Sequence, residues 1–154
     1  MSKRGQDSSS MGFWIIGAII VIAIVAVTVM AFKGSPSSKT TRELALTCTT
    51  DMATQFHIHP VLKIVVKGQS QELPANVGIT SSCMMPLHTH DNTGIIHVES
   101  PEKRDFNLGD FFAVWEKDIR SFGESMKMTV NKTDKEDYEN YVLKDKDEIV
   151  LIFD

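Results

Sequence analysis

One unbroken apolar run constrains this chain more than any other feature of its sequence. Residues 11–32 read MGFWIIGAIIVIAIVAVTVMAF, in which Thr28 is the single ordinary polar side chain. At about 1.5 Å per residue, a helix of this length spans roughly 30 Å, which is the hydrocarbon thickness of a bilayer. The run therefore predicts a transmembrane helix near the start of the chain.

A cleavable signal peptide is the competing interpretation of this run, because residues 29–31 resemble a small-residue cleavage site. The apolar core is longer than the 7–15 residues of a typical signal sequence, which favours an uncleaved anchor. Basic residues lie on both sides of the run, so their count does not decide its orientation. A short N-terminal tail with a translocated C-terminal domain is the commoner arrangement, and it predicts a domain outside the cytoplasm.

The rest of the 154-residue chain divides by composition around this helix. Residues 1–10 are polar and lack apolar periodicity, which predicts a disordered tail. Residues 33–41, rich in Gly, Ser, Pro and Thr, predict a flexible stalk. Residues 42–154 then form the globular domain, which is large enough for one domain of modest size.

Apolar and polar residues alternate through most of this domain, which indicates strands. A Gly-containing turn at Lys67-Gly68 follows one such segment, and Ile96 and Val98 should face the core in another. Residues 109–120 carry apolar side chains at helical spacing and predict one short amphipathic helix. The fold class expected is therefore α+β, mainly antiparallel sheet with one short helix.

The C-terminal residues 141–153 resemble the last strands of β-grasp, or ubiquitin-like, domains. They read as a strand pair that contains the pattern Leu-x-Asp-x-Asp-Glu-Ile. Small sulfur carriers belong to that group, but they end in Gly-Gly, whereas the last residues here are Phe153 and Asp154. The resemblance implies a loosely β-grasp-like end of the sheet, and no sulfur-carrier role is expected.

All five histidines of the chain lie in two clusters, and four of them form His-x-His pairs. Residues i and i+2 of a strand point to the same face, so each pair presents two imidazoles side by side. Two such strands brought together make a nitrogen-rich site for a transition metal. The sequence predicts one shared copper or zinc site at His57, His59, His88, His90 and His97, with Cys83 and Asp91 as further ligand candidates.

The two cysteines, Cys48 and Cys83, allow two interpretations. In an oxidising compartment they would form a disulfide, and this fits a chain with two cysteines that both lie in the predicted external domain. In the rival assignment, Cys83 is a thiolate metal ligand and Cys48 a second one. Imidazole with carboxylate suits zinc, whereas imidazole with the thioethers of Met84 and Met85 would suit copper.

Three known kinds of site match the sequence poorly. A cupin needs a glutamate soon after its His-x-His, but position 94 is Gly and Glu99 comes late. A blue-copper site usually has a late Cys-His-Met loop, whereas here the methionines directly follow Cys83. A Cys-His hydrolase would need an activated thiol, and nothing marks Cys83 as one. No catalytic residue is predicted.

Four segments of the chain resemble an uncharacterised family of membrane-anchored extracytoplasmic proteins from archaea and some bacteria. They read FHIHPVLKIVVKG, LPANVGI, CMMPLHTHDNTGIIHVESP and LGDFF, and the resemblance covers residues 48–116. It implies a location at the outer membrane face and no particular activity. We expect a metal-binding accessory protein, such as a small subunit or metal-delivery partner of a membrane metalloenzyme. The alternative is a non-metal interaction module whose histidines sit in polar networks, and no nucleic-acid partner is expected.

Overall fold

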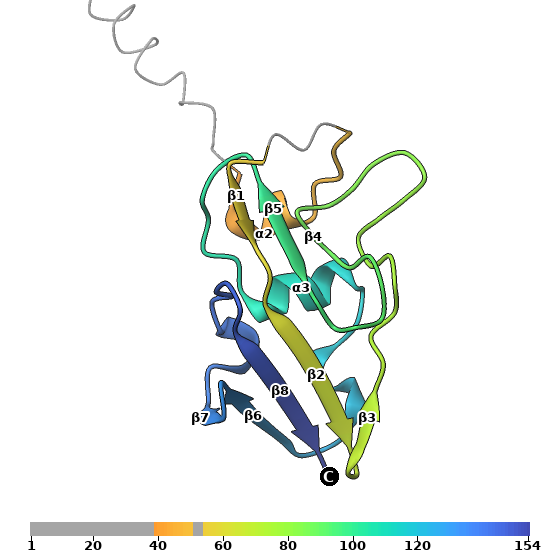
Figure 1. The fold of residues 1–154 in the computed structure, drawn as a ribbon, viewed down its shortest axis with the longest axis vertical. Helices are drawn as coiled ribbons and strands as arrows, with labels where there is room; N and C mark the ends of the chain where they lie inside the picture. The colour runs from red at the N-terminus through yellow and green to blue at the C-terminus, as the bar shows by residue number, and fades with distance from the viewer. Residues whose placement is uncertain (1–38, 51–53) are drawn as a thin grey trace, which may run out of the picture. The chain divides into compact units, whose positions relative to one another are not determined.

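Two β-sheets share one nearly continuous stretch of extended chain, residues 56–66 (Figure 1). Strand β1 (Phe56–Ile58) belongs to a three-stranded sheet, and strand β2 (Val61–Val66) belongs to a five-stranded sheet. His59 and Pro60 lie between them. Proline has no N–H to donate to a ladder, which suits a position where a chain passes from one sheet to another.

This computed structural model describes residues 39–50 and 54–154. The predicted tail, the predicted transmembrane helix and residues 33–38 of the predicted stalk lie outside these ranges. Within the described ranges, no helix combines the length and the apolar character needed to cross a membrane.

The smaller sheet has the order β1-β5-β4 and is antiparallel throughout. Strand β4 (Leu87–His88) and strand β5 (His97–Ser100) form the predicted hairpin around the Asp-Asn-Thr-Gly turn. Ile96 and Val98 are fully buried, as predicted. Because side chains alternate along a strand, His97 and Glu99 are directed to the opposite face.

The larger sheet has the order β3-β2-β8-β6-β7. Most neighbours are antiparallel, but β2 and β8 run parallel at its centre, a pairing that the sequence did not predict. The strands not yet given bounds are β3 (Gln69–Gln71), β6 (Met126–Val130), β7 (Thr133–Lys135) and β8 (Glu148–Phe153). The expected mixed α+β class, with mostly strands and few short helices, is confirmed.

The helices are shorter and more numerous than expected. The predicted helix at residues 109–120 is two elements, α3 (Leu108–Val114) and the 3₁₀ turn η1 (Ile119–Phe122). Glu116, between them, has a φ of 56°, which an α-helix cannot accommodate. A further 3₁₀ turn, η2 (Tyr138–Asn140), follows strand β7 and was not predicted.

Helix α2 (Thr41–Ala45) was not predicted. Its cap, Thr40, lies in the predicted stalk, but Thr40 and Glu43 form a capping box. Arg42 of α2 makes an ion pair of 3.0 Å with Asp110 of α3, and it donates to the Gly109 carbonyl. These contacts fix α2 to the rest of the domain.

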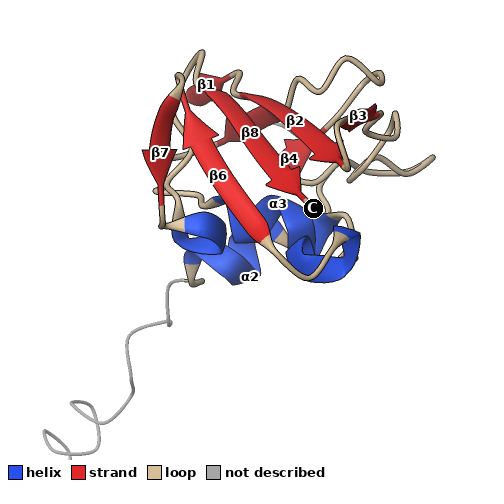
Figure 2. Cartoon of the chain, turned by 90° about the horizontal axis from the view of Figure 1, so that it is seen from below, coloured by secondary structure: helices blue, strands red, loops and turns tan. Residues whose placement is uncertain are grey.

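The core lies between the larger sheet and the helices, which gather on one of its faces (Figure 2). Burial of the alternating residues of β2 and β8 removes a continuous apolar surface from water, which is the main driving force for this packing. The largest fully buried side chains include Leu62, Ile64, Phe106, Phe111, Leu151 and Phe153.

The predicted disulfide between Cys48 and Cys83 is present, with the two Cα atoms 5.5 Å apart. Beside it, Thr49 and Met84 exchange backbone hydrogen bonds of 3.0 and 2.9 Å. The disulfide therefore joins the segment after α2 to the segment that leads into β4.

Candidate metal centre

Strand β5 lies at the centre of the smaller sheet and carries His97 and Glu99 on one face. His57 of β1 stands opposite Glu99, and His88 of β4 stands opposite His97. Directly opposite residues of adjacent strands bring their side chains together. The sheet thereby gathers histidines from both clusters of the sequence, as expected, and places β5 between the two His-x-His segments.

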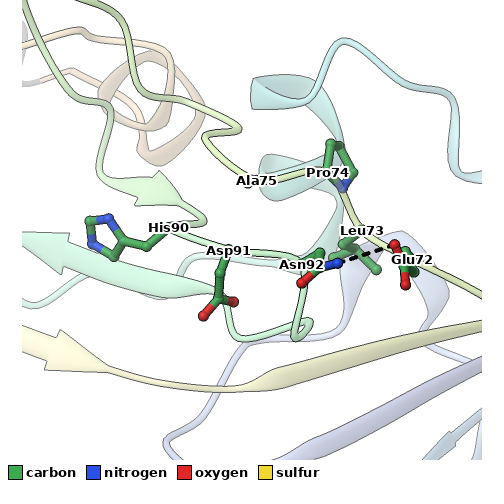
Figure 3. Close-up of a pocket in the computed structure, with 7 residues that line it drawn as sticks. All are labelled: Glu72, Leu73, Pro74, Ala75, His90, Asp91 and Asn92. Carbon is green, nitrogen blue, oxygen red and sulfur yellow. Dashed lines mark hydrogen bonds between the residues drawn. The ribbon is translucent and has the colours of Figure 1, made fainter.

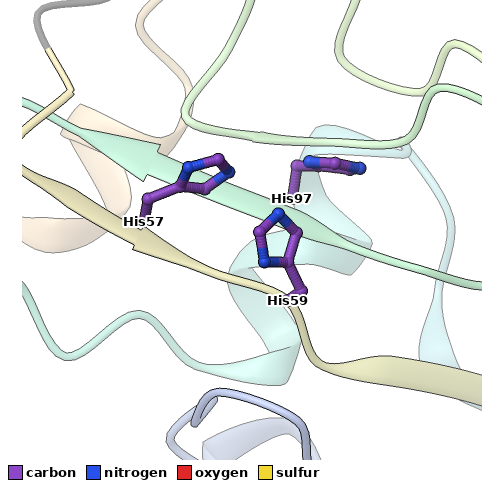
Figure 4. Close-up of side chains that lie close together, drawn as sticks. All are labelled: His57, His59 and His97. Carbon is purple, nitrogen blue, oxygen red and sulfur yellow. The ribbon is translucent and has the colours of Figure 1, made fainter.

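The first of two histidine triads contains His57, His59 and His97 (Figure 4). Their candidate ligand atoms all lie within 4.8 Å of one another. The ring centroid of His59 is 4.3 Å from that of His57 and 4.7 Å from that of His97. Zinc–nitrogen bonds of about 2.0–2.1 Å place tetrahedral ligands roughly 3.4 Å apart, so small side-chain rotations can close this triad around an ion.

The second triad contains His88, His90 and again His97, and its ligand atoms meet the same 4.8 Å limit. The ring of His97 is centred 5.4 Å from that of His88 and 4.5 Å from that of His90. Among the described residues, no ring contact joins His57 or His59 directly to His88 or His90. His97 is therefore the member through which the two triads meet.

His88 is the most informative residue of the cluster, because its side chain is completely buried. Its Nδ1 lies 3.0 Å from the Met85 carbonyl oxygen. A carbonyl can only accept, so Nδ1 carries the proton and Nε2 has a free lone pair. That Nε2 is buried without a hydrogen-bond partner. Burial lowers the pKa of His88 to about 4, against weaker opposing effects of Met85 and Glu99, so the imidazole is neutral at pH 7.

Glu99 belongs to this cluster, although it was not among the predicted ligands. One carboxylate oxygen, Oε1, lies 3.0 Å from His57 Nε2, 3.9 Å from His97 Nδ1 and 4.0 Å from His88 Nε2. The signal in the sequence was its position two residues after His97 on a predicted strand, which places both side chains on one face.

The Asp145 carboxylate contacts His59 without belonging to either triad. The Asp145 carboxylate accepts a 2.9 Å hydrogen bond from the backbone N–H of His59 and lies 3.9 Å from its Nδ1. Such outer partners orient metal-binding imidazoles.

Burial also lowers the pKa of His97, helped by the neighbouring His90 and His59, which favours its neutral form.

The two weaker ligand candidates lie outside both triads. The sulfur of Cys83 is bonded to Cys48, so the disulfide-bonded protein has no thiolate there, and the interpretation of Cys83 as a metal ligand is wrong for this form. Asp91 Oδ1 accepts hydrogen bonds from the backbone and the hydroxyl of Thr93, at 2.9 and 2.6 Å. These bonds lower the Asp91 pKa and hold the carboxylate in a local turn.

An open pocket of about 530 Å³ borders the second triad at His90 (Figure 3). Its polar lining includes Glu72, Asp91 and Asn92, and Asn92 donates a 3.1 Å hydrogen bond to Glu72. His90 itself is exposed. The second triad therefore combines a buried member, His88, with a member that solvent and solutes can reach.

Comparison with known proteins adds no assignment, since no family model, no curated protein and no solved structure matches this chain.

Proposed function

We propose that this protein is a membrane-anchored, extracytoplasmic metal-binding accessory protein that holds or delivers copper or zinc. The single observation that carries the proposal is His88 Nε2, a neutral, buried imidazole nitrogen whose lone pair has no partner and lies among other histidines. A buried polar atom without a partner is costly. Coordination of a metal ion would satisfy this one.

The exposure of His90 supports delivery or exchange rather than a closed structural site. Structural zinc sites are usually four-coordinate and closed, whereas sites with three protein ligands keep a position open. Each triad supplies three imidazoles, and the pocket at His90 gives access to the second one. The recipient would be a membrane metalloenzyme, and this protein would act as its small subunit or as its metal-delivery partner.

The membrane anchor and the location outside the cytoplasm are each supported by one feature, the first by the apolar run and the second by the disulfide. Residues 11–32 have the length and composition of a membrane span. The Cys48–Cys83 disulfide is typical of proteins that fold in an oxidising compartment.

We also infer a β-grasp-like arrangement for the larger sheet. Its central parallel pair, β2 and β8, joins the first and last strands of that sheet, which is the arrangement of β-grasp domains. A fold likeness of this kind carries no activity by itself.

The test is metal retention by the full chain, purified in a mild detergent. The protein is loaded with copper or zinc, dialysed, and analysed for metal per chain. We expect the wild type to retain metal, and His97→Ala to weaken binding at least about tenfold because it removes a ligand from both triads. Gln71→Ala, on the exposed strand β3, is the matched control and should bind as the wild type does.

A wild-type protein that retains neither metal would instead favour the alternative function. In that case the histidines form a polar network on a scaffold, in which Glu99 and Asp145 are hydrogen-bond partners and nothing more.

A further inference from the structure

The donor atoms of the histidine cluster exceed what one metal ion can use. The two triads and Glu99 together offer five imidazoles and one carboxylate, whereas zinc takes four ligands in tetrahedral sites. The rings of His57 and His59 contact His97 but are not in ring contact with His88 or His90 in the described part of the chain. One ion bound in either triad would therefore leave the other pair without metal.

The central strand supplies two groups that can serve both triads at once. An imidazole has two ring nitrogens, so His97 can offer one to each side. The Glu99 carboxylate lies 3.0 Å from His57 of the first triad and 4.0 Å from His88 of the second. The backbone N–H of Glu99 donates a 2.8 Å hydrogen bond to the Pro86 carbonyl, which fixes the strand between its neighbours.

Negative charge is distributed on both sides of the cluster. Asp145 lies beside His59, and Asp91 interacts electrostatically with His90 and His97. Together with Glu99 between them, these carboxylates reduce the repulsion that two divalent ions would experience at close range.

We propose that the cluster is a dinuclear centre, with one ion on His57 and His59, a second on His88 and His90, and both His97 and Glu99 shared between them. This inference rests on the proposed metal-binding function and adds a second ion to it. If His97 donates both ring nitrogens, its remaining N–H proton leaves to solvent as the second ion binds.

The experiment counts copper ions and measures their coupling. The full chain in detergent is treated with a chelator, titrated with Cu(II), freed of excess metal, and analysed for copper per chain. We expect two ions in the wild type. We also expect an electron paramagnetic resonance signal smaller than the total copper content, because Cu(II) ions that share ligands couple magnetically.

Variants then separate the two positions. His57→Ala with His59→Ala should bind one ion with full signal intensity, and His90→Ala should do the same. His57 and His90 are exposed, so these variants avoid the buried His88. Gln69→Ala with Gln71→Ala, on β3, is the matched control and should bind two coupled ions. Circular dichroism checks that each variant is folded. The number of copper ions per wild-type chain is measured without any variant, so a variant that fails to fold does not affect that result.

Several results would overturn the dinuclear centre. A wild type that binds a single copper ion would exclude the dinuclear centre. Two copper ions whose electron paramagnetic resonance signal accounts for all the copper would exclude it too, and in both cases the proposed function stands. Two ions in the variant that lacks His57 and His59 would exclude it as well. A wild type that binds no copper and no zinc would remove the proposed function itself.

Discussion

His88 illustrates how the surroundings of one residue set its chemistry. Burial lowers its pKa from 6.5 to about 4 in the folded protein. Of the charged and titratable groups that face it, Glu99 raises the pKa, whereas His90 and His97 lower it. An unfolded chain binds a proton on this imidazole below about pH 6.5, whereas the folded protein does so only near pH 4. The stabilising contribution of neutral His88 is therefore complete above pH 6.5 and is lost as the pH falls toward 4.

For the metal-free protein we predict that this loss is on the order of 3 kcal/mol, because each pKa unit corresponds to about 1.4 kcal/mol. Urea unfolding between pH 7.5 and 4 measures it, with a chelator present and with His88→Gln for comparison. Carboxylates titrate in both proteins, so the difference between the two pH profiles isolates His88. Parallel profiles would mean that His88 is not held neutral by burial.

At the scale of elements, the loop between β4 and β5 is fixed to β2 through Gly94. The Gly94 carbonyl accepts a 2.8 Å hydrogen bond from the Leu62 N–H, and Gly94 has a φ of +89°. A Cβ at this position would lie 2.4 Å from the Leu62 carbonyl oxygen. Only glycine allows both the conformation and the close approach, and this contact sets where the chain returns to place His97.

We predict that Gly94→Ala lowers the free energy of unfolding by about 2–3 kcal/mol, since it adds a backbone clash to conformational strain. Gly68→Ala is the matched control: Gly68 has a φ of +78° in the turn between β2 and β3, but a Cβ there meets nothing within 4 Å. It should cost about 1 kcal/mol. Chemical denaturation of both variants gives the comparison, and equal costs would refute the role of the clash.

At the scale of the whole molecule, the disulfide closes a long stretch of chain. It joins residues 35 positions apart, Cys48 and Cys83, and so connects the segment after α2 to the segment that precedes β4. Cross-linking restricts the unfolded chain more as the loop lengthens. We predict that reduction lowers the free energy of unfolding by roughly 3–4 kcal/mol.

Urea unfolding with and without a reductant measures this effect. Cys48→Ser with Cys83→Ser should match the reduced protein and should not respond to the reductant. An oxidised and a reduced protein of equal stability would contradict the prediction.

The sequence by itself determined the features that depend on local order. Alternation along strands is a property of neighbouring residues, so it predicted that Ile96 and Val98 are buried and that His97 faces away from them. It also predicted that each His-x-His pair shares a face. For Cys48 and Cys83 the sequence allowed a disulfide or a pair of thiolate ligands, and the structure shows the disulfide. The helices were predicted less well. The positive φ of Glu116 depends on backbone geometry, whereas the start of α2 has a signal in the sequence, the capping-box pattern Thr40-x-x-Glu43.

Only the tertiary structure decided what joins these features. The register of β5 between β1 and β4 places His97 in both triads and brings Glu99 within 3.0 Å of His57. The parallel pairing of β2 with β8 and the approach of Asp145 to His59 likewise link residues far apart in the chain. Strand register is set by the burial of whole faces, and burial is a property of the packed molecule, so no local pattern could have specified which histidine is shared.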